Sequence, residues 1–405
     1  GTAHEAALDH GELYQLTVFA KHYETPNFLK GGIMYQIFPD RFCKSGKPHE
    51  NVPTDRVLRD DWNGTPYYKP DANGHVWNND YFGGDLEGIR SKLDYLEKLG
   101  VTCIYLNPIF ESHENHRYNT ANYRNVDPLL GTNEDFRVLC EDAEKHGISI
   151  ILDGVFSHTG ADSIYFNKFS HYPDAGAYNA GSASPYYGWY DFRHYPNDYR
   201  CWWNFPDLPE VDEGNADWRD FVITGRDSVV RTWIRRGAAG WRLDVANEIN
   251  HDFWRAFRRE VRALKPDAVL IGEIWDDARS FLEGEQFDSA MNYNLTFAID
   301  DFFAYGRLSA REFMQRVQQV GGGGIQLMDG GNGLFANRIV GVVGVDKGEV
   351  VGGDGHAECG KAFGHPLGLF VGEADISAQV LQRLDAVTHL PVPVVPMLVC
   401  HLGKE

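Results

Sequence analysis

Residues 148–153 read Ile-Ser-Ile-Ile-Leu-Asp, an almost wholly apolar run that ends in a carboxylate. Such a run is typical of a parallel strand that is buried on both faces. It follows a segment with helical spacing of apolar residues, which begins at a capping box over residues 132–135 and ends at Gly147. A helix followed by a buried strand is the repeating unit of a parallel α/β fold.

The same unit recurs along most of the chain. Helix-like segments alternate with short apolar runs, and about six βα units are recognisable between residues 33 and 317. We therefore predict an α/β fold, a (β/α)8 TIM-type barrel that is incomplete in this chain, with a small subdomain inserted after the third strand. The six apolar runs are residues 33–37, 101–106, 148–152, 240–243, 269–271 and 289–291.

Three carboxylates stand at the ends of three successive apolar runs: Asp153, Asp244 and Glu273. In a parallel barrel the carboxyl ends of the strands meet on one face, where such folds carry their active sites. A single strand-end acid is more often a helix cap or a loop anchor, but three at matched positions favour a shared site. The sequence therefore predicts that these three side chains converge.

Arg242 precedes Asp244 by two residues, so in a strand both side chains lie on one face. A guanidinium beside Asp244 would keep that carboxylate ionised, as a nucleophile requires. If burial or the neighbouring acid raises the pKa of Glu273, it can hold a proton and act as general acid and then base. This pair suits retaining glycoside hydrolysis, for which the carboxyl groups should lie about 5–5.5 Å apart.

Several motifs then carry a family resemblance. They are residues 34–42 (MYQIFPDRF), 83–86 (GGDL), 115–120 (NHRYNT), 153–158 (DGVFSH), 240–248 (GWRLDVANE) and 272–275 (GEIW). Together they resemble the α-amylase family of glycoside hydrolases. Within that family, the ending of residues 245–248 is most similar to the cyclomaltodextrinase, neopullulanase and maltogenic amylase group.

The resemblance implies a role for each matched residue. Asp244 would be the nucleophile, Glu273 the acid/base and Arg242 the partner that orients Asp244. Tyr118 would be a platform beneath the sugar that is cleaved and His158 would bind one of its hydroxyls. Asp153 and His116 complete the implied substrate-binding set; His116 could equally be an ordinary polar loop residue.

The same resemblance implies a calcium site that uses Gly83 and Asp85, together with an Asn/Asp-rich loop after residues 40–42. Here that loop carries Lys44 and Lys47 instead of acidic or amide side chains. A lysine ammonium cannot ligate a hard cation. We therefore expect no required cofactor, with a structural calcium ion as the weaker alternative.

The end of the sequence departs from the family. Its fourth motif, a His-Asp pair after the sixth or seventh strand, is missing beyond Met291, since His251-Asp252 lies only one loop after the nucleophile. The chain holds 10 Trp and 20 Tyr, yet none follows Tyr305, and residues 321–324 are four consecutive glycines. We hypothesise a shifted reading frame near residue 318, which would leave an atypical Gly/Val-rich tail.

The predicted organisation has five parts. The insertion stands out because 15 of the 45 residues at 161–205 are Phe, Trp or Tyr, so we expect it to pack around its own aromatic rings and to lend only a few of them to a ligand. The parts are residues 1–19, the remnant of an N-terminal β-domain; residues 20–32, a linker; residues 33–317, the catalytic barrel; residues 159–216, the inserted subdomain; and residues 318–405, the tail.

Charge and composition exclude some partners. With 38 Lys and Arg against 58 Asp and Glu, the net charge is -20, which repels nucleic acids and anionic lipid surfaces. No run of 18 apolar residues is present, so we expect no membrane partner. The six cysteines lack C-x-x-C spacing and are expected to be free thiols, which favours a cytoplasmic location.

The implied function is retaining hydrolysis of α-1,4-glucosidic bonds, with α-1,6 bonds as a further candidate, in maltodextrins, cyclodextrins or pullulan. The implied partners are therefore α-glucans, and a homodimer is expected if the N-terminal domain is present. Two alternatives stay open. The missing His-Asp pair favours a non-catalytic α-glucan-binding protein or an inactive truncated enzyme. The three acids could also hold Mg²⁺, as in enolase-type barrels, although Arg242 would compete with the metal.

Overall fold

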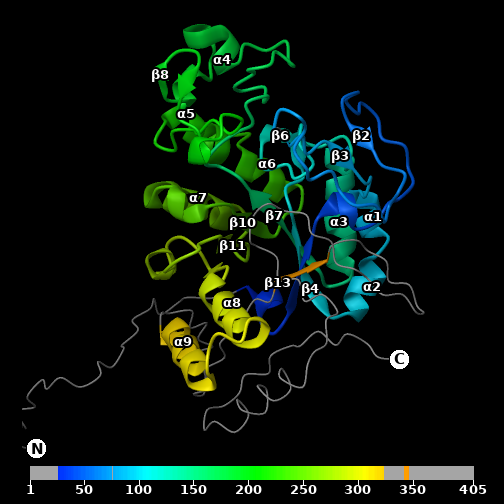
Figure 1. The fold of residues 1–405 in the computed structure, drawn as a ribbon, viewed down its shortest axis with the longest axis vertical. Helices are drawn as coiled ribbons and strands as arrows, with labels where there is room; N and C mark the ends of the chain where they lie inside the picture. The colour runs from blue at the N-terminus through cyan, green and yellow to red at the C-terminus, as the bar shows by residue number, and fades with distance from the viewer. Residues whose placement is uncertain (1–25, 75, 323–341, 346–405) are drawn as a thin grey trace, which may run out of the picture.

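The structure is a computed structural model that describes residues 26–74, 76–322 and 342–345. A curled, seven-stranded parallel sheet forms its centre, with helices on the outer face (Figure 1). This arrangement is the predicted TIM-type barrel in incomplete form. The predicted β-domain remnant at residues 1–19 lies outside the described residues, as does most of the predicted tail.

Six of the seven strands follow each other across the sheet in sequence order, as consecutive βα units require. The order is β12-β11-β10-β7-β4-β1-β13, and every neighbouring pair is parallel. The strands are β1 (Ile33–Ile37), β4 (Val101–Leu106), β7 (Ser149–Gly154), β10 (Gly240–Leu243), β11 (Val269–Gly272), β12 (Ser289–Ala290) and β13 (Val342–Val345).

The helices follow the predicted pattern between strands. The capping box at Thr132 and Asp135 is present at the start of α3, and the chain leaves that helix through Gly147 at φ +69°. The helices are α1 (Leu86–Arg90), α2 (Leu93–Lys98), α3 (Asn133–Lys145), α5 (Ala216–Arg219), the π-helical η6 (Asp220–Thr224), α6 (Val229–Arg235), α7 (His251–Leu264), α8 (Tyr293–Ile299), the π-helical η9 (Asp300–Ala304) and α9 (Ala310–Gly322).

Each central strand sends alternate side chains to opposite faces of the sheet. In β7, Ile150 and Leu152 belong to the large core between the sheet and the helices. Ile151 belongs instead to a smaller core inside the curl, where it meets Tyr105 of β4. By the same alternation Asp153 faces the interior, which is how an apolar strand can place a carboxylate at its end.

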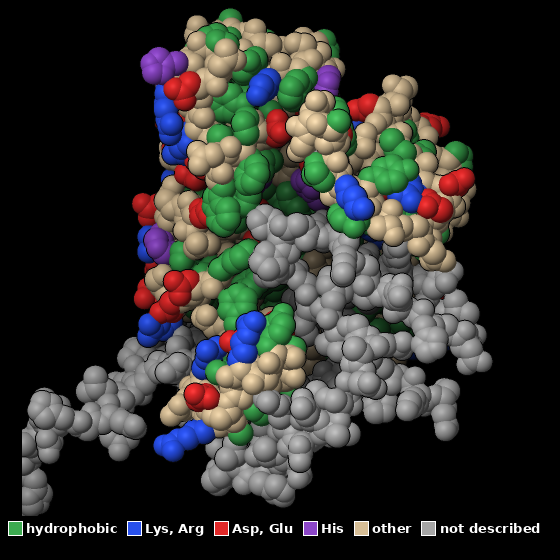
Figure 2. Space-filling model, in the orientation of Figure 1, with side chains coloured by type: hydrophobic (Ala, Val, Ile, Leu, Met, Phe, Trp, Pro, Cys, Tyr) green, Lys and Arg blue, Asp and Glu red, His purple; other side chains and the backbone are tan. Residues whose placement is uncertain are grey.

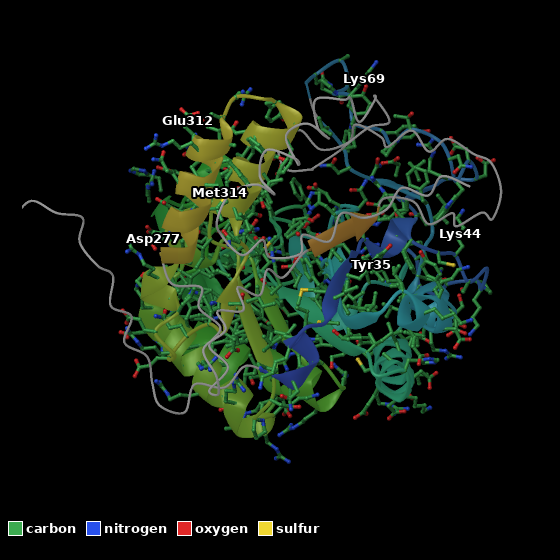
Figure 3. The ribbon with its side chains drawn as sticks, turned by 90° about the horizontal axis from the view of Figure 1, so that it is seen from below. Tyr35, Lys44, Lys69, Asp277, Glu312 and Met314 are labelled. Atoms are coloured by element: carbon green, nitrogen blue, oxygen red, sulfur yellow. The ribbon has the colours of Figure 1, made fainter. Side chains whose placement is uncertain are left out.

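β13 lies in the predicted tail, beyond the six βα units recognised between residues 33 and 317. It pairs in parallel with β1, with Val343 opposite Tyr35 (Figure 3). In the described part of the chain, β12 and β13 are therefore the two edges of the sheet. α9 also extends past residue 317, to Gly322.

The insertion forms a separate layer above the sheet (Figure 1). Most of its rings pack on one another, as predicted: the ring centroids of Tyr165 and Trp189 are 5.4 Å apart, and those of Phe166 and Tyr190 are 4.8 Å apart. Its elements are α4 (Ala177–Ala180), η3 (Gly181–Ala183), η4 (Tyr187–Trp189), β8 (Phe192–His194), β9 (Asp198–Tyr199) and η5 (Trp202–Asn204).

The remaining short elements lie at the edges of this framework. Hydrophobic side chains line the described surface between the insertion and the part that carries β2 and β3 (Figure 2). The remaining short elements are η1 (Asn27–Leu29), η2 (Pro39–Arg41), β2 (Val57–Leu58), β3 (Asp80–Tyr81), β5 (Phe110–Ser112), β6 (Thr120–Val126), η7 (Ala246–Glu248) and η8 (Arg279–Phe281).

Two compositional expectations can be compared with the described residues. The four cysteines there, Cys43, Cys103, Cys140 and Cys201, are free thiols. Within the same residues, every helix is too short or too polar to cross a bilayer.

Candidate active site

The three predicted carboxylates lie at the ends of three adjacent strands. Asp244 and Glu273 directly follow β10 and β11, whereas Asp153 is the penultimate residue of β7. The strand register places Arg242 opposite Asp153 on one side and opposite Ile271 on the other. Parallel pairing without a register shift therefore brings the three acids to the same face of the sheet, as predicted.

Arg242 contacts all three carboxylates of this cluster. Its Nη1 lies 2.7 Å from Asp244 Oδ1 and 3.0 Å from Asp153 Oδ1, and its Nη2 lies 2.9 Å from Glu273 Oε2. The four residues are only 2% to 7% exposed. A buried guanidinium is tolerated here because three carboxylates surround it, and its fork fixes their relative positions.

The cluster carries three acidic groups but a single cation, so the acids compete for protons. Burial and the negative charge of Glu273 raise the pKa of Asp244 well above its ordinary value, despite Arg242. Burial acts on Glu273 in the same direction, but Arg242, the Val245 N–H and the Tyr293 hydroxyl outweigh it and lower the pKa of Glu273. These two directions favour a proton on Asp244 over one on Glu273.

Both pKa directions are opposite to the sequence-based expectation, which requires an ionised Asp244 and a protonated Glu273. The expectation considered Arg242 as a partner of Asp244 alone. In the structure Glu273 accepts from Arg242, from the Val245 N–H at 3.1 Å and from the Tyr293 hydroxyl at 2.9 Å. Three donors stabilise its ionised form in the substrate-free chain.

Tyr118 joins the cluster from the loop that precedes β6. Its hydroxyl donates to Asp153 Oδ2 at 3.1 Å and accepts from Asn107 Nδ2 at 3.1 Å. His116 Nδ1 accepts from the Tyr118 N–H at 3.0 Å, and its Nε2 lies 2.6 Å from Glu114 Oε2. Tyr118 thus borders the carboxylates directly, whereas His116 lies behind it and positions its backbone.

His158 lies where the barrel meets the insertion. Its Nδ1 is 2.9 Å from Ser157 Oγ, and the centroid of its ring is 5.7 Å from that of Trp202. Burial lowers the pKa of His158 to about 4, so the ring is neutral at pH 7. A neutral imidazole with Nδ1 engaged by Ser157 is suited to offer Nε2 to a hydroxyl.

Sequence reasoning missed several residues of the site. Tyr105 donates its hydroxyl to Asp153, and Tyr293 donates to Glu273. The indole N–H groups of Trp202 and its neighbour in η5 both donate to Glu248, at 2.8 and 3.0 Å. Only Tyr105 had a usable signal, because it alternates with outward-facing residues on a predicted strand.

The predicted calcium position does not suit a calcium ion. Asp85 caps α1 through Gly88 N–H at 2.6 Å, and it also accepts from the hydroxyl of Ser45 at 2.5 Å and lies 3.2 Å from His49 Nε2. Lys44 approaches Gly83: a Cβ built on that glycine would lie 4.0 Å from the ammonium. The Asp85 oxygens already accept from donors, and the Lys44 ammonium lies near Gly83.

The Mg²⁺ alternative does not fit the geometry either. A metal held by Asp153, Asp244 and Glu273 would need the space that the guanidinium of Arg242 occupies, within 3.0 Å of all three. Moving Arg242 aside would leave its charge buried without a partner.

Comparisons with known proteins agree with this geometry. The family model for the alpha amylase catalytic domain matches residues 36–320. The amylopullulanase of Thermoanaerobacterium saccharolyticum is 44% identical over 321 residues, which cover 71% of this chain and 25% of that protein. Neopullulanase 2 of Thermoactinomyces vulgaris is 38% identical over 298 residues, which cover 72% of this chain and 47% of that protein.

Solved structures give the same result. The cyclic alpha-maltosyl-(1→6)-maltose hydrolase from Arthrobacter globiformis, in complex with cyclic alpha-maltosyl-(1→6)-maltose, has a TM-score of 0.64 and 31% identity. The match covers 74% of this chain and 63% of that one. The chain spans half or less of the two curated relatives above. Because the family model matches well over half of it, the chain belongs to the alpha-amylase family.

Proposed function

We propose that this chain cleaves α-glucosidic bonds of maltodextrin, cyclodextrin or pullulan-type substrates by a retaining double displacement. The α-1,4 bond is the first candidate and the α-1,6 bond the second. The observation that carries the proposal is the contact of Arg242 with both Asp244 and Glu273, at 2.7 and 2.9 Å, at the ends of adjacent strands. Relatives named amylopullulanase, neopullulanase and cyclomaltodextrinase support the substrate class.

The first chemical step needs an ionised nucleophile and a protonated acid. In the proposed mechanism, substrate binding moves the shared proton from Asp244 to Glu273. Asp244 then attacks the anomeric carbon, while Glu273 gives its proton to the departing glycosidic oxygen. The products of this step are a free sugar hydroxyl and a glycosyl ester on Asp244.

The second step restores the enzyme. Glu273, now ionised, takes a proton from a water molecule, whose oxygen attacks the anomeric carbon and releases Asp244. Two inversions at one carbon give net retention. Arg242 is suited to both steps because it stabilises whichever of the two carboxylates carries the negative charge.

Asp244→Asn tests the proposal. The amide cannot form the glycosyl ester, so turnover of soluble maltodextrin should fall by several orders of magnitude. Asp252→Asn is the matched control, since Asp252 is an exposed residue of α7 whose carboxylate pairs only with Arg255 among the described contacts. Wild-type turnover in Asp244→Asn would refute the assignment.

The competing function is α-glucan binding without catalysis, or an inactive truncated enzyme. The absence of a His-Asp pair after Met291 in the sequence favours it. Reducing-sugar release and maltodextrin affinity measured on the same full-length sample separate the readings. Binding of maltodextrin without any release of reducing ends would select the non-catalytic function. Resequencing of the coding DNA across residue 318 tests the hypothesis of a shifted reading frame.

We also propose that the position at Gly83 and Asp85 takes no calcium. The support is the set of donors around Asp85 and the nearby Lys44 ammonium. Added millimolar calcium should leave the melting temperature unchanged. A calcium-dependent rise in the wild-type chain that disappears in Asp85→Asn would refute this.

Two further expectations from the sequence stay predictions. A cytoplasmic location is compatible with a relative named intracellular maltogenic amylase in Bacillus subtilis. Homodimer formation through an N-terminal domain predicts a dimer in size-exclusion chromatography coupled to light scattering. Cell fractionation tests the cytoplasmic location, and the molar mass from light scattering tests the homodimer.

A further inference from the structure

Three metal-ligating side chains meet between the barrel and the insertion, outside the cluster around Arg242. His113 follows β5, whereas Asp162 and His171 belong to the inserted subdomain. One ligand atom of each residue lies within 4.8 Å of the others. The rings of the two histidines are close, with their centroids 4.7 Å apart.

Two buried polar atoms of this group have no hydrogen-bond partner. They are Nδ1 of His113 and Oδ1 of Asp162. Asp162 is only 9% exposed, and its Oδ2 lies 3.8 Å from His113 Nδ1, which is too far for a hydrogen bond. Buried polar atoms without partners are costly, so a ligand bound by these two side chains would offset that cost.

The neighbouring tyrosine determines which nitrogen of His113 carries its proton. The Tyr172 hydroxyl donates to Glu111 Oε1 at 3.0 Å, and it lies 3.3 Å from His113 Nε2. Since the hydroxyl has a single proton, it accepts from Nε2–H. His113 Nδ1 therefore presents a lone pair towards the Asp162 carboxylate, and two acceptors face each other.

The protonation of these side chains and the charges near them affect how a cation would bind. Burial, with a smaller contribution from Arg56, lowers the pKa of His113 to about 4, so its ring is neutral at pH 7. Burial raises the pKa of Asp162 to about 7. Arg56 opposes a cation, but Asp55 neutralises it at 2.9 Å and also lies 3.9 Å from His113 Nδ1.

We propose that His113, Asp162 and His171 bind one zinc ion that joins the β5–β6 loop to the inserted subdomain. Two imidazoles and a carboxylate match the donor preference of zinc and not that of calcium. Tetrahedral zinc ligands at about 2.0–2.2 Å from the metal lie about 3.4 Å from each other, so small side-chain rotations close the present separations. The Glu111–Tyr172–His113 chain supplies the outer hydrogen bonds that orient a metal-bound histidine.

The position of this site gives it a structural role. His113 precedes His116 by three residues, and Asp162 follows His158 by four. A metal bound there would fix two loops that carry predicted substrate-binding residues, without contact with the reacting atoms. Zinc should therefore stabilise the fold and lower KM more than it changes kcat.

A second group, Asp94, Glu97 and His146, provides an internal comparison. It is largely exposed, and His146 Nδ1 is already 2.7 Å from Glu97 Oε2. The atoms of this group are thus solvated or paired, so they do not indicate a missing ligand. It makes His146→Ala a suitable control for zinc binding to ordinary surface groups.

The test is equilibrium dialysis of the metal-free, full-length chain against zinc alone, with the melting temperature measured in parallel. We expect one equivalent of tightly bound zinc and a higher melting temperature. His171→Ala, which removes an exposed ligand without disturbing the core, should weaken zinc binding by about tenfold or more, whereas His146→Ala should not. Cobalt in place of zinc should give visible absorption bands that disappear in His171→Ala.

Asp162→Asn keeps the shape of the side chain and removes its charge. It should abolish tight zinc binding while the metal-free melting temperature stays the same or rises, because the repulsion between the two acceptors is relieved. The proposal is overturned if the wild-type chain binds no zinc, if His171→Ala binds it as well as the wild type, or if the loss follows His146→Ala.

Discussion

The guanidinium of Arg242 binds Glu273 directly, with Nη2 2.9 Å from Oε2, while its other terminal nitrogen holds Asp244 at 2.7 Å. One cation thus serves the proposed nucleophile and the proposed acid at once. Any change in its position or number of donors alters the protonation of both carboxylates.

Arg242→Lys is expected to lower kcat by about 100-fold, because an ammonium cannot hold three carboxylates in the planar geometry of a guanidinium. Arg242→Ala should also lower the free energy of unfolding by about 3 to 5 kcal/mol, since it leaves buried acids without a cation. Initial rates on maltodextrin and denaturant unfolding measure the two effects. The control is Arg255→Lys on the exposed side of α7, and equal losses in both lysine variants would contradict the role of Arg242.

Tyr293→Phe is expected to shift the pH dependence of kcat, which reports the substrate-bound enzyme. The Tyr293 hydroxyl stabilises ionised Glu273 through a 2.9 Å hydrogen bond, so its removal raises the pKa of Glu273. Glu273 acts as the acid, and activity falls on the alkaline side when it loses its proton. The alkaline limb should therefore move to higher pH, whereas in Tyr305→Phe, which changes an exposed ring, it should stay in place. An unchanged or lower alkaline limb would exclude this coupling.

His158 should make the fold sensitive to acid. Burial depresses its pKa from 6.5 to about 4, so between these values the unfolded chain binds a proton that the folded chain does not. The resulting contribution to stability is present above pH 6.5 and is lost as the pH falls towards 4, up to about 3 kcal/mol.

His158→Gln removes this titration. Unfolding free energies at about pH 7 and about pH 4.5 should differ less in His158→Gln than in the wild type. The exposed His194 offers a control, since the unfolding free energy of His194→Gln should decline with falling pH as that of the wild type does. A steeper decline in His158→Gln would show that the sign of this argument is wrong.

Gly240→Ala should be strongly destabilising. The residue has φ +148°, and an added Cβ would lie 2.0 Å from the carbonyl oxygen of Val269 on the neighbouring strand. Gly74→Ala is matched for positive φ, at +83°, but its Cβ would meet nothing within 4 Å. We expect the free energy of unfolding to fall by about 1 kcal/mol in Gly74→Ala and by several times that amount in Gly240→Ala. Thermal unfolding measures both losses. Similar losses at both positions would mean that backbone strain, and not the contact with Val269, determines the effect.

The convergence of the three carboxylates could be predicted because it depends on local rules. The period-two alternation of β7 and β10 fixes which side chains face inward, and parallel strands bring Asp153, Asp244 and Glu273 to one edge. Neither rule needs information about distant residues. The capping box of α3 was predictable for the same reason.

The partners of the carboxylates could not be predicted, because they come from distant segments. Tyr293 reaches Glu273 from α8, 20 residues later in the chain. Without this donor and the contact of Arg242 with Glu273, the sequence gives no sign that the pKa of Glu273 is lowered in the substrate-free chain. The pairing of β13 with β1 could not be predicted from the sequence either, because no alternation of helix and strand patterns surrounds residues 342–345.

The order of the strands separates the chemistry from the edges of the sheet. Asp153, Asp244 and Glu273 come from β7, β10 and β11, and each of these strands is paired on both sides. The distances between the three carboxylates are thus set within five consecutive strands, β4 to β12, and neither β1 nor β13 is among them. Changes to β13 should loosen the β1 edge first and reach the carboxylates last, so that stability and catalytic geometry can vary independently in this chain.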